Sequence, residues 1–105
     1  MTTELTGNEY IILRALEQGV SILNAFAHHT QFSVNKPSGE QWQQKYNRQM
    51  HELNGMQEMA LHFGYKVTFD FDEKQGFFAE VTSINIMFIN DGGEVLSKYR
   101  HLIRR

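Results

Sequence analysis

Cysteine is absent from this chain, proline occurs once, and no run of apolar residues approaches the length of a membrane span. Without cysteine, disulfides and thiolate metal sites are excluded, and the composition is typical of a reducing compartment. A membrane-spanning helix needs ~20 predominantly apolar residues, so we expect no membrane association and a cytoplasmic location. The 105 residues, of which 41% are hydrophobic, predict one domain with its own core.

The hydrophobic periodicity of the chain changes at Gly64. Before this glycine, apolar residues recur every three or four positions, which is typical of amphipathic helices. We predict one helix over about residues 7–29, with Thr6 as its N-cap, and a second helix from a cap at Ser38 to about Phe63. Gly64 is expected to end the second helix in the left-handed conformation. The two helices are expected to form an antiparallel pair.

After Gly64 the pattern is that of strands. Residues 65–72 alternate between apolar and polar without exception, which predicts a strand with one face toward the helices. A hairpin loop follows, and then an extended segment over 77–90 whose apolar positions change faces near Thr82 and Ser83. A β-bulge at this point explains the change.

The last segment, 94–105, is compatible with two structures. Asp91-Gly92-Gly93-Glu94 is either the cap of a helix or the turn of a hairpin. The apolar positions that follow have helical spacing: Val95, Leu96, Tyr99, Leu102 and Ile103. We therefore expect a short C-terminal helix and keep a third strand as the alternative. The predicted fold is α+β, with two N-terminal helices packed on a small antiparallel sheet of two or three strands and a short C-terminal helix.

The first predicted helix has a wide apolar surface made of two adjacent stripes. The second stripe consists of Ile12, Ala15, Gly19, Ile22 and Phe26. Its small residues permit the close approach of another helix. The stripe either packs inside the chain, between the sheet and the second helix, or forms the seam of a homodimer.

Two further apolar residues are assigned to the same kind of contact. Met87 and Ile89 alternate with the expected core positions of their strand, so we expect them to face outward from the sheet. Exposed apolar side chains of this kind usually mark a protein contact.

No pattern in the chain predicts catalysis or a metal site. His51-Glu52 begins the zinc-protease motif, but Gly55 stands where the motif requires its second histidine. His51, Glu58 and His62 share one side of the second helix, yet His51 and Glu58 are ~10 Å apart along the helix axis. We therefore expect no catalytic residue, no metal ligand and no cofactor.

Charge is unevenly distributed, although the formal net charge is only −2. Residues 70–94 carry six acids and one base, whereas the last residues carry Lys98, Arg100, Arg104 and Arg105 and no acid. These four bases are candidate contacts for nucleic acid or for an acidic partner. The slightly acidic chain as a whole argues against a dedicated nucleic-acid binder.

We predict that the protein is a small non-catalytic protein-interaction module. It is expected to be a homodimer and to act as a regulator or inhibitor by binding a larger protein partner. Two alternatives remain open. One is a nucleic-acid-binding protein that uses the basic C-terminal segment, and the other is a domain that binds a small ligand or a metal between the helix pair and the sheet.

Overall fold

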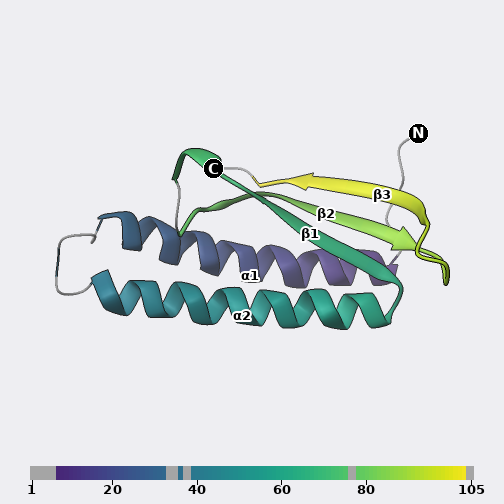
Figure 1. The fold of residues 1–105 in the computed structure, drawn as a ribbon, viewed down its shortest axis with the longest axis horizontal. Helices are drawn as coiled ribbons and strands as arrows, with labels where there is room; N and C mark the ends of the chain where they lie inside the picture. The colour runs from purple at the N-terminus through teal and green to yellow at the C-terminus, as the bar shows by residue number, and fades with distance from the viewer. Residues whose placement is uncertain (1–6, 33–35, 37–38, 76–77, 104–105) are drawn as a thin grey trace.

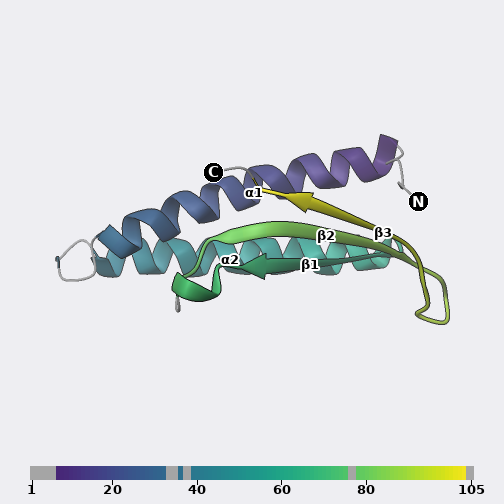
Figure 2. The same ribbon diagram turned by 90° about the horizontal axis from the view of Figure 1, so that it is seen from above.

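The structure, a computed structural model, describes residues 7–32, 36, 39–75 and 78–103. Two long helices, α1 (Gly7–Phe32) and α2 (Gly39–His62), precede the strands β1 (Tyr65–Phe71), β2 (Val81–Ile89) and β3 (Val95–Leu102). One turn of 3-10 helix, η1 (Glu73–Gln75), follows β1. Both helices lie on the same face of the sheet (Figure 1, Figure 2). The predicted α+β architecture is confirmed, with three antiparallel strands.

The two helices form an antiparallel pair that fits together at Gly19. This residue is buried, and a Cβ atom at its position would come within 2.7 Å of Leu53 Cδ2. The side-chain amide of Gln49 donates a hydrogen bond to the Gly19 carbonyl oxygen at 3.1 Å. The missing side chain therefore lets α2 approach α1 closely. Within the described residues, no helix combines the length and the hydropathy that crossing a membrane requires.

The sheet has the strand order β1-β2-β3. The register between β1 and β2 shifts where Asp70 pairs with Ser83 and Phe71 pairs with Val81. Thr82 is the extra residue on β2, so the predicted β-bulge is confirmed.

Side-chain amides attach each helix to a different strand. Asn24 of α1 bonds the backbone of Val81 twice: its Nδ2 donates to the carbonyl oxygen at 3.0 Å, and its Oδ1 accepts from the amide at 2.7 Å. Gln57 of α2 donates to the carbonyl oxygen of Val67 in β1 at 3.0 Å. The core between the two layers includes Leu13, Leu16, Val20, Leu23, Leu53, Val67, Ile84 and Ile86.

Gly64 lies two residues after the end of α2 and has a φ of +88°, so its predicted left-handed conformation is confirmed. Its amide donates to the carbonyl oxygen of Leu61 at 3.0 Å, which satisfies one of the last carbonyls of the helix. The predicted N-caps, Thr6 and Ser38, lie outside the described residues.

The predicted C-terminal helix is replaced by strand β3 in the described residues. The Gly93 amide donates to the Asn90 carbonyl oxygen at 2.9 Å, and Gly93 has a φ of +81°, so the chain reverses direction. The hairpin alternative is therefore the correct one. Pairing satisfies backbone groups of β2 that would otherwise stay open, and this tertiary gain outweighs the helical spacing of the apolar residues. As a consequence Leu102, a core position of the predicted helix, is 64% exposed.

Candidate interaction surfaces

An apolar groove lies between the N-terminal half of α1 and the C-terminal half of α2. Its volume is about 160 Å³. The lining residues are all apolar: Ile12, Ala15, Leu16, Met56, Met59, Ala60 and Phe63. We call this feature the helix groove. Its two methionines have flexible side chains that adapt to the shape of a bound group.

The helix groove opens on the side of the helix pair that faces away from the sheet. Met59 follows Gln57 by two residues, which is about 200° around the helix. Because Gln57 bonds to β1, Met59 projects away from the sheet. Two large side chains that line the groove are largely exposed: Met59 (65%) and Phe63 (69%). The groove therefore has an apolar rim that contacts solvent.

The structure brings part of the predicted interface together at this groove. Ile12 and Ala15 line it, and Ile22 is exposed on α1. Ile22 lies two residues before Asn24, so it also projects away from the sheet. Gly19 is buried against α2, where it serves packing within the chain.

The other predicted interface residues lie on different surfaces. Phe26 is partly buried, with its ring 6.1 Å from that of Trp42 at the other end of the helix pair. Met87 lies on the sheet face that points away from the helices and is partly buried. Ile89 ends β2, and its amide donates to the Gly64 carbonyl oxygen at 3.0 Å. The seven predicted residues therefore do not form one patch.

Aromatic side chains cover the helix contact at the end opposite the helix groove. The Trp42 ring stacks on the His29 ring with 4.3 Å between centroids and 16° between planes. Lys45 Nζ lies 4.5 Å from the centre of the Trp42 ring. Side chains of the chain itself therefore close this end of the helix pair.

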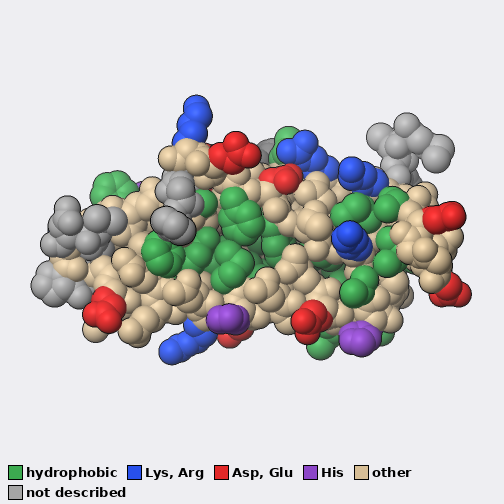
Figure 3. Space-filling view, in the orientation of Figure 1, with side chains coloured by type: hydrophobic (Ala, Val, Ile, Leu, Met, Phe, Trp, Pro, Cys, Tyr) green, Lys and Arg blue, Asp and Glu red, His purple; other side chains and the backbone are tan. Residues whose placement is uncertain are grey.

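Hydrophobic side chains also reach the surface between β1 and α2. Figure 3 shows them along the line where the sheet layer meets α2, with charged side chains at the margins. Met50, Tyr65 and Phe69 are partly buried and pack against the core. These side chains form the edge of the core between the sheet and α2. This surface is therefore already packed, whereas the helix groove is open.

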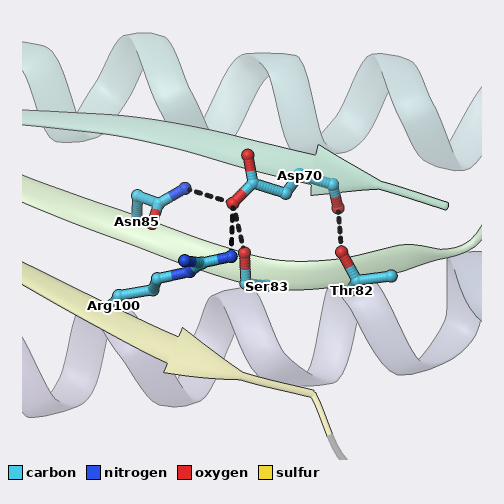
Figure 4. Close-up of polar contacts among 5 residues, drawn as sticks. All are labelled: Asp70, Thr82, Ser83, Asn85 and Arg100. Atoms are coloured by element: carbon cyan, nitrogen blue, oxygen red, sulfur yellow. Dashed lines mark hydrogen bonds and ion pairs between the residues drawn. The ribbon is translucent and has the colours of Figure 1, made fainter. Parts of the chain in front are cut away.

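The outer face of the sheet, which points away from the helices, carries a polar cluster around Asp70 (Figure 4). Asp70 Oδ2 accepts hydrogen bonds from the Ser83 hydroxyl and from Asn85 Nδ2, the latter at 3.0 Å. It also lies 3.5 Å from an Nη atom of Arg100. The hydrogen bonds from Ser83 and Asn85, with smaller help from Arg100, lower the pKa of Asp70 below its usual value of 3.8. The resulting stabilisation is present above that value and is lost as the pH falls through the lowered pKa.

Two of the four basic residues predicted as partner contacts lie on this outer face. Lys98 and Arg100 are both in β3 and are exposed. Met87 pairs with Lys66 on one side and with Lys98 on the other, so the two lysines flank it. Arg104 and Arg105 lie outside the described residues. The predicted contact is thus on a sheet face, where we expected a helix.

A polar cleft of about 700 Å³ lies between α1 and the last part of β3. Its lining includes Glu17, Asn24, His28, Glu80 and His101. His101 Nε2 is 3.1 Å from Glu17 Oε1, so this pair joins β3 to α1. If the protein binds a small ligand, which is one of the alternative functions, this cleft is the candidate site. Within the described residues, no group of three or more metal-ligating side chains is placed to hold an ion.

Sequence reasoning missed the residues that dominate these surfaces. Phe63 and Met59 belong to the apolar pattern of the second helix, and no local signal separates core from rim within such a pattern. Glu17 and His101 meet only because β3 folds back beside α1. Their pairing has no signature in either segment.

Three features are thus candidate binding surfaces: the helix groove, the outer face of the sheet and the polar cleft. The first is apolar, the second charged and the third polar, so each suits a different class of ligand. Compared with protein-family models, with curated proteins and with solved structures, the chain matches none.

Proposed function

We propose that this protein is a non-catalytic protein-interaction module that self-associates through the helix groove. The observation that carries the proposal is the wholly apolar lining of the groove together with the exposed side chains of Met59 and Phe63 at its rim. Removing such surface from water gains about 25 cal/mol per Å². Contiguous exposed apolar patches mark protein contacts. A regulatory or inhibitory action on a larger protein stays a prediction.

A second copy of the chain is the occupant that suits this groove. The groove and the exposed Phe63 side chain are adjacent on one surface. A two-fold axis beside them places Phe63 of each copy in the groove of the other. Such a contact is self-complementary and closes after two copies. Because only apolar side chains line the groove, pairing leaves no unpaired charge there.

The outer side of the helix pair sets an upper limit for the area of a dimer contact. The 24 residues of α2 span about 36 Å at 1.5 Å per residue. Two packed helices of ~10 Å diameter present a side about 20 Å wide. The whole side therefore covers roughly 700 Å², close to the ~800 Å² that each partner buries in a standard interface, and the helix groove occupies one end of it.

The substitution Phe63→Glu tests this proposal. A carboxylate at the rim would have to lose its hydration in the dimer, so we expect self-association to weaken at least tenfold, the effect of ~1.4 kcal/mol. Sedimentation equilibrium over a concentration series measures the dissociation constant of the full chain. Circular dichroism checks that the variant remains folded.

Phe32→Glu is the matched control. Phe32 is also 69% exposed and also stands at the C-terminal end of a helix, so the helix dipole acts on both carboxylates alike. We expect this variant to dimerise like the unmodified chain. A chain that stays monomeric at high micromolar concentration would disprove the proposal, and so would equal losses in the two variants.

A further inference from the structure

Strand β3 has a free edge. Ile103 donates its amide hydrogen to the Thr82 carbonyl oxygen at 2.9 Å. The alternation of an antiparallel ladder then directs the N–H and C=O groups of Lys98, Arg100 and Leu102 away from β2. Within the described residues, these groups have no hydrogen-bond partner. Such an edge is a template for another strand.

The opposite edge of the sheet is partly covered by α2. Gln57 of α2 donates to the carbonyl oxygen of Val67, so a helix side chain already occupies an acceptor on β1. At the edge of β3, the pair of His101 and Glu17 joins the strand to α1 through side chains. The backbone of β3 is therefore the more accessible of the two edges.

The polar cleft lies directly beside this edge. It separates α1 from the end of β3, and Ile103 contributes apolar surface to its walls. A strand added to β3 would point every second side chain toward α1 and the remaining ones onto the outer face. The cleft offers space for the side chains that point toward α1.

Charge on the outer face decides which segment fits. Lys98 has no ion-pair partner within the described residues, whereas Arg100 already faces Asp70 at 3.5 Å. If two copies of β3 paired antiparallel, Lys98 and Arg100 of one copy would lie beside those of the other. Like charges across a strand pair are destabilising, so self-pairing is disfavoured. An added segment with acidic side chains at the same positions would be attracted to Lys98 and Arg100.

We infer that the free edge of β3 binds an extended peptide segment of a partner protein by strand addition. Its acidic side chains lie on the outer face, and its other side chains point toward α1, where the cleft has both polar walls and the side chain of Ile103. Backbone hydrogen bonds supply affinity, and alternate side chains supply specificity. The helix groove opens on the far side of the helix pair, so this binding does not require self-association.

Amide hydrogen exchange followed by NMR on the full chain tests the backbone contacts. The probe is a peptide of about ten residues that alternates Glu and Val. In the free protein, the amides of Lys98, Arg100 and Leu102 should exchange quickly. With peptide bound they should be protected about tenfold or more. The amides of Tyr99 and His101, which are bonded to β2, should change little. If the peptide binds but does not protect alternate amides of β3 in this way, the proposal is wrong.

A matched pair of lysine substitutions tests the charge contacts. Lys98 and Lys66 share the outer face and flank Met87, but Lys66 belongs to the opposite edge. By fluorescence anisotropy, Lys98→Ala should weaken peptide binding about two- to fivefold. Lys66→Ala should leave it unchanged, and a peptide that alternates Lys and Val should bind more weakly. Equal losses in the two variants contradict edge binding.

A labelled single-stranded oligonucleotide separates strand addition from the nucleic-acid alternative. If the oligonucleotide binds, both alanine variants weaken it equally and the acidic peptide does not bind, then the outer face is the site and the proposal is wrong. Phe63→Glu separates this inference from the proposed dimer. That variant should bind the peptide as tightly as the unmodified chain, whatever its oligomeric state.

Discussion

The two ends of the helix pair are both apolar, yet only one of them is closed. At the closed end, Trp42 of α2 reaches α1 and stacks on His29. At the open end, Ala15 of α1 and Ala60 of α2 both line the helix groove, while Phe63 is largely exposed. A large side chain at the contact closes one end, and small residues on both helices leave the other hollow.

This difference teaches that residue size at facing positions, more than hydrophobicity, decides where a helix pair exposes an apolar surface. Interiors pack to a nearly constant density, so two small residues facing each other leave a space that another group must fill. Amphipathic periodicity is the same at both ends and does not report this space.

The largest expected effect comes from opening the closed end. Trp42→Ala removes the stacking on His29 and the contact with Phe26. A fully buried Trp→Ala change costs ~3–5 kcal/mol, and because Trp42 is only partly buried we expect about 2–3 kcal/mol of lost unfolding free energy. Urea denaturation measures it. Phe32→Ala, at an exposed ring, should cost far less, and similar losses in the two variants would refute the packing role of Trp42.

Tyr46, one helical turn after Trp42, makes the unfolding free energy depend on pH. Its hydroxyl donates to the Ala79 carbonyl oxygen at 2.7 Å, and burial raises the pKa of Tyr46 from 10.0 to about 12. Between these values the unfolded chain loses the phenol proton and the folded chain keeps it. The stabilisation is thus fully present below pH 10 and is lost as the pH rises through the folded value.

We expect the unfolding free energy to fall across this window by roughly 1–2 kcal/mol more in the unmodified chain than in Tyr46→Phe. The full conversion of ~1.4 kcal/mol per pKa unit is an upper limit, because the surroundings of a buried group relax when it ionises. Chemical denaturation at a series of alkaline pH values provides the comparison. Parallel curves for the two proteins would show that Tyr46 does not carry this effect.

The smallest expected effect on stability comes from filling the open end. Ala15→Leu places three more carbon atoms in the helix groove, so we expect the monomer to gain about 0.5–1 kcal/mol while self-association weakens. Thermal unfolding and sedimentation measure the two changes. Ala25→Leu, at an exposed site on the same helix, is the control and should alter neither. Tighter self-association of Ala15→Leu would show that the groove is not where the copies meet.

Much of the fold followed from local patterns. Gly64 ended the second helix because only glycine adopts its positive φ at low cost, and that requirement is local. The bulge at Thr82 followed from side chains that change faces, since a strand has a strict period of two. The first helix continues to Phe32, beyond the expected end near His29. Inside it, Thr30 donates its hydroxyl to the Phe26 carbonyl oxygen at 2.8 Å.

The candidate sites were less predictable. Gly19 was a possible dimer contact from its small size, and the same property lets α2 pack against it. Ile12 and Ala15 were correctly grouped, but the helix groove also needs residues of α2 that belong to an ordinary apolar stripe. The Asp70 cluster joins three strands, so its members become neighbours only once the register is set.

The sequence by itself determined two helices, the glycine between helices and sheet, and the alternating strand with its bulged neighbour, because each depends on backbone preferences and side-chain periodicity within a short window. Only the tertiary structure decided that the last segment is a strand, that Gly19 is buried and that the helix groove is open. These outcomes depend on which surface meets which, and the free energy of that contact is shared between segments far apart in the chain.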